Sequence, residues 1–157
     1  MTQERGIRYE RGPYVQVACF CETVVQGNDG TLTLVRIIDH LTHTAAGPEP
    51  PAEMPPVTHR MKMVLALKSG EARGRHELQT RPDPPSRELG PPAITTSVLF
   101  EGEHRGINII GDMTYTFSLE GLYWFRVYLD GLLLTAIPFR VDYQRIATGA
   151  IPPPGSR

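Results

Sequence analysis

Asp39, His40 and His43 stand close together in the segment IIDHLTH, and His59 follows beyond a proline-rich segment. Carboxylate and imidazole groups are common ligands of divalent transition metals. On a β-strand, residues three apart face opposite sides, so His40 and His43 converge only if the strand ends between them. We therefore expect solvated polar side chains here and assign no metal and no cofactor. The alternative hypothesis is a metal-dependent enzyme, or a sandwich that binds a small ligand such as a carbohydrate, using the region of Asp39, His40 and His43.

Cys19 and Cys21 are the only two cysteines of the chain. Strand alternation puts both on one face with Cα atoms about 7 Å apart, where a mutual disulfide would be strained. Because a Cys-x-Cys pair supplies only two ligands, we expect buried apolar side chains rather than a metal or redox site. Two thiols without a bridge are typical of a reducing compartment.

Glu22 follows these cysteines on the same predicted strand, and a buried carboxylate there needs a partner. Arg36 and Arg126 are the candidates, and we expect a buried structural ion pair rather than a general base. No serine lies in a Gly-x-Ser-x-Gly turn, and no glycine-rich phosphate loop precedes a helix. These absences favour a role other than catalysis.

Charge and hydropathy exclude several classes of partner. The 16 basic and 17 acidic side chains are well mixed, with a net charge of −1, so no broad basic surface is expected for nucleic acid or anionic lipid. No apolar run approaches the ~20 residues of a membrane span, and the first residues carry charges where a secretory signal needs an apolar stretch. Together with the unbridged cysteines, this predicts a cytoplasmic protein.

Short alternating segments dominate the chain, and 15 prolines and 15 glycines predict many turns. Strands are expected at 14–25, 31–42, 59–68, 75–80, 94–100, 107–120, 122–129 and 132–143. The first of them should be central, and a turn at Gly27 to Gly30 joins it to the second as a hairpin. The segments 59–68 and 75–80 are expected to pair with each other.

The alternation also assigns faces to these strands. One face is predicted for Val15, Val17, Cys19 and Cys21, another for Met61, Met63, Leu65 and Leu67, and an inward side for Ile94, Thr96, Val98 and Phe100. We therefore predict an all-β, two-sheet antiparallel immunoglobulin-like β-sandwich of about 7–9 strands.

The proline-rich segments set the expected boundaries. The sandwich domain should span 13–143, between a flexible segment 1–12 and a proline-rich flexible tail 144–157. Segments 44–58 and 81–92 are rich in proline, which opposes ladder pairing, so both are predicted to be connections. The first could be a loop or an ordered lid.

The final hairpin turns at Asp130-Gly131, and its parity depends on the loop length. A two-residue loop would leave large apolar residues on both faces. We therefore predict a three-residue loop with Gly131 left-handed and a bulge. This aligns Tyr123, Phe125 and Val127 with Leu133, Thr135, Ile137, Phe139 and Val141, and it turns Trp124, Arg126, Tyr128, Leu132, Leu134 and Ala136 outward.

Two elements together carry a family resemblance: the strand ending at Cys21-Glu22, and the segment Gly121-Leu-Tyr-Trp-Phe-Arg-Val127 followed by Asp130-Gly131. They resemble an uncharacterised family of bacterial immunoglobulin-like proteins, a domain of unknown function, over about residues 14–142. The resemblance implies a sandwich in which Tyr123 can close a corner through its hydroxyl group.

Trp, Tyr and Arg are enriched among the anchors of protein interfaces. An outward patch of Trp124, Arg126 and Tyr128 with Leu132 and Leu134 is therefore either a partner-binding surface or the seat of a covering proline-rich loop. We favour a non-catalytic interaction domain that self-associates or docks into a larger bacterial assembly through this outer face.

Overall fold

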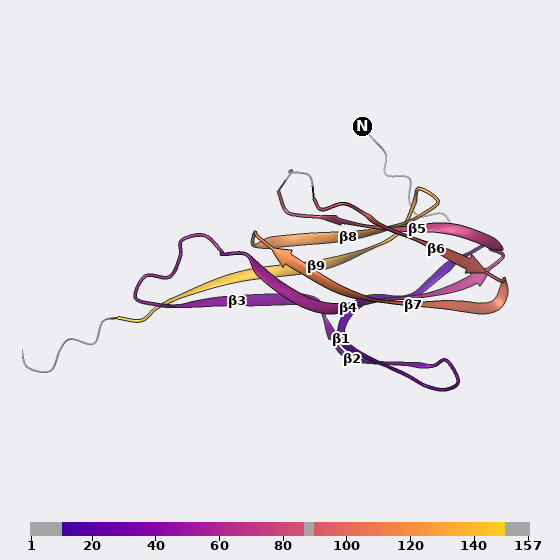
Figure 1. Cartoon of the computed structure of the whole chain (residues 1–157), viewed down its shortest axis with the longest axis horizontal. Helices are drawn as coiled ribbons and strands as arrows, with labels where there is room; N and C mark the ends of the chain where they lie inside the picture. The colour runs from indigo at the N-terminus through magenta and orange to yellow at the C-terminus, as the bar shows by residue number, and fades with distance from the viewer. Residues whose placement is uncertain (1–10, 87–89, 150–157) are drawn as a thin grey trace, which may run out of the picture.

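The computed structural model describes residues 11–86 and 90–149, and within this part every regular element is a β-strand (Figure 1). The nine strands are β1 (Tyr14–Gln26), β2 (Leu32–Ile38), β3 (His40–Gly47), β4 (Val57–Gly70), β5 (Gly74–Asp83), β6 (Ile94–Phe100), β7 (Glu103–Phe117), β8 (Gly121–Leu129) and β9 (Leu132–Ala147). Residues 1–10 of the predicted flexible segment and 150–157 of the predicted tail lie outside the described residues. The tail prediction is wrong for its first residues, because β9 continues to Ala147.

The strands form two sheets. Sheet A has the order β2-β1-β4-β7, and sheet B has the order β3-β9-β8-β5-β6. The predicted all-β, two-sheet class and the central position of β1 are confirmed. Sheet B curls into half a barrel, and the immunoglobulin-like assignment stays a prediction. The entirely antiparallel arrangement is wrong, because β3 and β9 pair in parallel and project at one end of the molecule (Figure 1).

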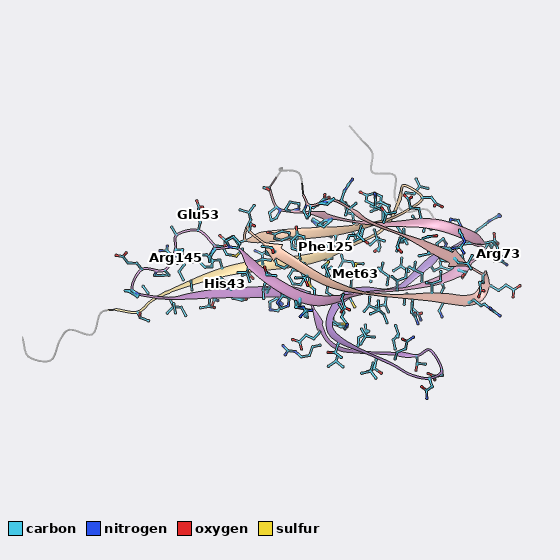
Figure 2. All side chains as sticks on the ribbon, in the orientation of Figure 1. His43, Glu53, Met63, Arg73, Phe125 and Arg145 are labelled. Carbon is cyan, nitrogen blue, oxygen red and sulfur yellow. The ribbon has the colours of Figure 1, made fainter. Side chains whose placement is uncertain are left out.

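Aromatic side chains fill the space between the sheets. The ring of Phe20 from sheet A meets Phe125 and Phe139 from sheet B edge to face, at centroid distances of 4.8 and 5.7 Å, and Phe117 stacks on Phe139 at 5.2 Å. Phe125 and Met63 are seen between the layers in Figure 2. Burying one such side chain contributes about 1.5–3 kcal/mol. The predicted common face of Met61, Met63, Leu65 and Leu67 is confirmed, since all four contact this core.

The predicted face of β1 is wrong at its start because the strand contains a bulge. The register with β4 shifts between Val15 and Val17, so that Gln16 is the extra residue. A bulge reverses the alternation that follows it. Val15, Ala18 and Phe20 therefore pack on the core, whereas Val17, Cys19 and Cys21 belong to the outer side of sheet A.

The segment predicted as one strand at 31–42 changes sheet at Asp39. β2 ends at Ile38 in sheet A, and β3 begins at His40 in sheet B. β3 runs on to Gly47, so residues 44–47 form ladder pairs that the proline content of 44–58 had argued against. The rest of this connection is an ordered loop, because Tyr143 Oη and Arg145 Nη2 donate hydrogen bonds to the carbonyls of Pro51 and Pro50.

The predicted pairing of 59–68 with 75–80 is also wrong. β4 pairs with β1 and β7, whereas β5 crosses to sheet B and pairs with β6 and β8. In sheet B, β5 places the apolar Leu78 in the core. The start of the 81–92 connection extends this strand, which ends at Asp83.

The edge strands bury less than their alternation predicts. In β6 only Val98 and Phe100 are buried, and Ile94 is 66% exposed. β7 begins at Glu103, earlier than the predicted strand start at 107. β6 is the edge strand of sheet B and has a neighbouring strand on one side only. The residues at its start are exposed on both faces.

The final hairpin has a two-residue turn, so the predicted three-residue loop is wrong. Asp130 and Gly131 have φ angles of 48° and 79°, and Leu129 pairs with Leu132. The bulge exists but lies further along, at Leu134, which is 2% exposed and belongs to the core. Its position restores the predicted register beyond it, in which Tyr123 faces Phe139, Phe125 faces Ile137 and Val127 faces Thr135. The predicted outward placement of Leu134 is therefore wrong. The predicted inward placement of Leu133 is wrong as well, because Leu133 pairs with the outward Tyr128.

Candidate functional site

The predicted partner-binding residues lie on the convex side of sheet B. Trp124, Arg126 and Tyr128 alternate along β8 with the buried Tyr123, Phe125 and Val127, and all three are half-buried. The neighbouring strand β5 places Arg81 opposite Arg126 and Asp83 opposite Trp124. We call Arg81, Asp83, Trp124, Arg126 and Tyr128 the outer-face cluster.

Hydrogen bonds link the charged members of this cluster. Arg126 Nε donates to Asp83 Oδ2 at 2.5 Å, and Arg81 Nε lies 3.7 Å from Asp83 Oδ1. The Arg81 guanidinium also donates to Tyr128 Oη at 2.6 Å and lies 5.0 Å from the centre of that ring. Such partly exposed ion pairs add little stability. Their main effect is to hold the two arginines and Tyr128 in fixed orientations.

The predicted 81–92 connection contributes Arg81 and Asp83 to this cluster, whereas its later described residues line a different hollow. Pro84, Gly90 and Pro91 line a hollow with Tyr115 and Tyr123, at the edge between the sheets. The 48–56 loop contacts Tyr143 and Arg145 at the projecting end. At the turn of the final hairpin Leu132 is 65% exposed. Of the predicted set, Trp124, Arg126 and Tyr128 lie on the outer face, whereas Leu134 belongs to the core and Leu132 pairs with the inward Leu129, so the predicted outward placement of these two leucines is wrong.

The predicted metal candidates do not converge. Asp39 Oδ1 and His40 Nδ1 are hydrogen-bonded at 2.8 Å, and this contact lowers the pKa of Asp39. β3 continues through both histidines, so His43 points the other way and stacks on Tyr143 at 5.9 Å. Within residues 11–86 and 90–149, no group of three or more His, Cys, Asp or Glu side chains is placed to hold a metal ion.

His59, and not His43, lines the same hollow as Asp39 and His40. A hollow of about 320 Å³ is lined by Glu22, Asp39, His40 and His59 together with residues of β2. The Nε2 atom of His59 is buried and has no hydrogen-bond partner within the described part of the chain. The predicted ion pair of Glu22 forms with Arg36 at 3.2 Å, but it is exposed rather than buried.

The two cysteines are free thiols, with Cys21 completely buried and Cys19 partly buried. Burial raises the pKa of both thiols, so both stay protonated at neutral pH. This arrangement agrees with the prediction of small apolar side chains.

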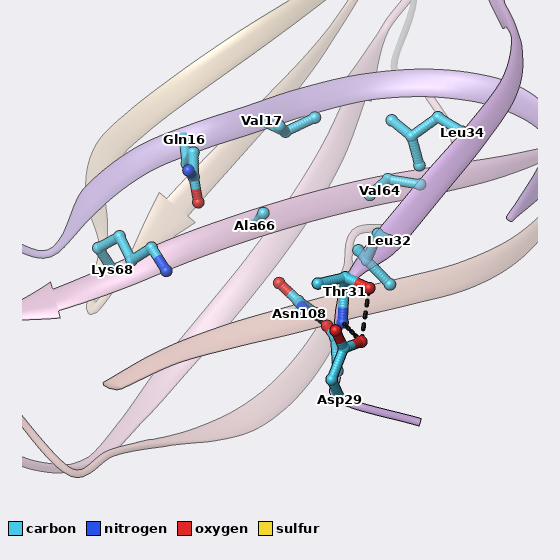
Figure 3. Close-up of a pocket in the computed structure, with 11 residues that line it drawn as sticks. Gln16, Val17, Asp29, Thr31, Leu32, Leu34, Val64, Ala66, Lys68 and Asn108 are labelled. Carbon is cyan, nitrogen blue, oxygen red and sulfur yellow. Dashed lines mark hydrogen bonds between the residues drawn. The ribbon is translucent and has the colours of Figure 1, made fainter. Parts of the chain in front are cut away.

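A groove that the sequence interpretation missed lies on the outer side of sheet A. The β1–β2 hairpin bends back over the sheet, and Asn108 Nδ2 on β7 donates to the carbonyl of Gly30 at its tip. The resulting space of about 480 Å³, which we call the hairpin groove, is shown in Figure 3. Its lining residues are Gln16, Val17, Asp29, Gly30, Thr31, Leu32, Leu34, Val64, Ala66, Lys68 and Asn108.

A sequence signal for this groove was present. Val64 and Ala66 are apolar residues on the face of β4 opposite to Met63 and Leu65, and both prove to be buried. A strand that is apolar on both faces must be covered on both faces. In the structure Leu32 and Leu34 of the β1–β2 hairpin provide this cover.

Tyr123 closes the corner between β7 and β8. Its hydroxyl donates to the Leu119 carbonyl at 2.8 Å and accepts from the Leu119 amide at 3.1 Å. Burial raises the pKa of this hydroxyl, which therefore remains a donor at physiological pH. The corner holds the start of β8, the strand that carries the outer-face cluster.

Fold and site together define an all-β, two-sheet domain with an aromatic and arginine cluster on its outer face. The model of a family of unknown function, DUF6941, matches residues 16–142, and the chain belongs to that family. The resemblance to an uncharacterised family is thereby confirmed. A search of curated proteins finds no match. No helix in the described part of the chain is long and apolar enough to span a membrane.

Proposed function

We propose that this domain is a non-catalytic interaction module of the bacterial cytoplasm that self-associates through the outer-face cluster. The observation that carries the proposal is the pairing of half-buried Trp124 and Tyr128 with two ion-paired arginines in the middle of a five-stranded sheet. Aromatic and arginine side chains of this kind form the energetic centres of protein interfaces.

The charges of this face argue for a second copy as the partner. Arg81 and Arg126 lie beside Asp83, and Arg140 pairs with Asp142 further along the same sheet at 3.1 Å. Because both signs alternate over a short distance, two copies related by a two-fold axis can place the arginines of one against the aspartates of the other. Preset orientations reduce the side-chain entropy lost on association.

Native mass spectrometry of protein purified without chelator tests the proposal, since one spectrum reports subunit count and bound metal. We expect a metal-free dimer or higher oligomer for the wild type. Trp124→Ala and Tyr128→Ala should raise the dissociation constant at least about 25-fold, as truncation of an interface anchor does. Ile37→Ala, which removes an exposed apolar side chain from sheet A, is the matched control and should associate as the wild type does.

A wild-type monomer at millimolar concentration would overturn self-association, as would unchanged assembly of both aromatic variants. Stoichiometric zinc or iron that is lost in His40→Ala would instead support the metal-dependent alternative at Asp39 and His40. The melting temperature of each variant, compared with the wild type, distinguishes lost association from lost folding.

A further inference from the structure

The floor of the hairpin groove has a small residue at its centre. Ala66 on β4 pairs with Val17 on one side and with Asn108 on the other. The β1 bulge places Gln16 beside Val17, and Lys68 follows Ala66 two residues along the same strand, on the same face. Figure 3 shows Gln16, Lys68 and Asn108 around Ala66.

These three side chains offer hydrogen-bond donors without a matching protein acceptor. Lys68 forms no ion pair within residues 11–86 and 90–149, unlike Lys62 on the same strand, whose Nζ lies 2.5 Å from Asp112. Asn108 uses one amide hydrogen on the Gly30 carbonyl and keeps a second one. The amide of Gln16 adds further donors.

The remaining charged residue of the groove is engaged elsewhere. Asp29 Oδ1 accepts hydrogen bonds from the Thr31 amide at 3.1 Å and the Thr31 hydroxyl at 2.6 Å, which ties this carboxylate to its own turn. The other wall is apolar, since Leu32 and Leu34 face Val17 and Ala66. The groove therefore combines a cationic end with an apolar trough.

We propose that the hairpin groove binds a small aliphatic carboxylate. The carboxylate group lies over Ala66, where the Lys68 ammonium and the amides of Gln16 and Asn108 donate to its oxygens. The aliphatic chain lies along Val17 under Leu32. Charge-assisted hydrogen bonds fix the position of the carboxylate, and the apolar trough selects for an attached alkyl group over a simple inorganic anion.

The test is a titration of the ¹⁵N-labelled full chain with sodium hexanoate, followed by two-dimensional NMR. Hexanoate should shift the backbone amide signals of Gly30, Ala66 and Asn108 in a saturable way. Lys68→Met, which keeps the length and apolar stem of the side chain, should weaken binding at least about tenfold, because a charged hydrogen bond is lost. Lys62→Met is the matched control on the same strand and face, and its affinity should equal that of the wild type.

Ala66→Val narrows the floor while Lys68 stays in place, so it should weaken hexanoate binding as well. Hexylamine, which has the same chain with a positive charge, and sodium phosphate are the comparison ligands. The proposal is overturned if hexanoate leaves the groove signals unchanged or binds Lys68→Met as tightly as the wild type. It is equally overturned if phosphate or hexylamine binds as well as hexanoate, which would mean an adventitious ion only.

Discussion

Replacement of Tyr123 by phenylalanine removes both hydrogen bonds of the corner and leaves the ring in the core. The hydroxyl joins the amide and the carbonyl of Leu119, and the tyrosine side chain is 2% exposed. Each buried neutral hydrogen bond contributes about 1 kcal/mol, so the free energy of unfolding should fall by about 2 kcal/mol. With an unfolding entropy of about 2.1 cal/mol/K per residue over 157 residues, the melting temperature should fall by about 6 °C.

Urea unfolding followed by the fluorescence of Trp124, the single tryptophan, measures this loss together with a thermal melt. Tyr143→Phe is the control, because its hydroxyl makes one hydrogen bond, to the Pro51 carbonyl, at an exposed position where water can replace it. The control should lose no more than about half as much. A Tyr123→Phe protein within about 0.5 kcal/mol of the wild type would refute the assignment of the corner as a stabilising contact.

Three further changes follow from the turns and the buried thiol. The hydrogen bond that His76 donates to the Asp130 carboxylate raises the pKa of His76, and the hydrogen bond that this carboxylate accepts from the Glu77 amide lowers the pKa of Asp130. The stability that His76 contributes is lost as the pH rises through its raised pKa, and the stability that Asp130 contributes is lost as the pH falls through its lowered pKa. The midpoints of urea unfolding should therefore show that the pair stabilises the protein most between about pH 4 and 6.5. An unchanged pH dependence of the midpoint in Asp130→Asn would contradict this. Gly131→Ala forces φ of 79° on a side chain and should cost about 1–2 kcal/mol in urea unfolding, whereas Gly111→Ala, in open extended backbone, should not destabilise. Cys21 should be alkylated by iodoacetamide at neutral pH only after unfolding, as mass spectrometry would detect; modification of the native protein at the rate of a free thiol would count against its burial.

Local alternation was sufficient to predict β8 and its two faces, but not the extension of β5 that brings Arg81 and Asp83 to the outer-face cluster. Phe125 and Trp124 fall on opposite faces of β8 because a strand has a period of two residues, and no tertiary contact changes that. The turn at Asp130-Gly131 was located correctly, but its length was not. The bulge that corrects the parity can occur at several positions of a hairpin, and only the packing of Leu134 in the core selects one.

Partners of strands far apart in the sequence could not be predicted. Nothing in the segment around Asp39 shows that the chain leaves one sheet and enters the other, because residues 31–42 contain no glycine or proline that would mark a break. The hairpin groove has the same origin: Val64 and Ala66 indicate a cover, but the bend that brings Leu32 over them results from the twist of the whole hairpin.

The parallel pairing of β3 with β9 has a consequence for the order of folding during synthesis. Leu41 pairs with Val141, a separation of 141 − 41 = 100 residues, whereas the last strand of sheet A ends at Phe117. At about 5–20 residues per second, β3 waits about 5–20 s on the ribosome for its partner. During that interval its backbone donors and acceptors are open to any neighbouring chain, and no lysine or proline within β3 discourages such pairing. Slower translation of the last third of the chain should therefore increase aggregation rather than improve the yield of folded protein.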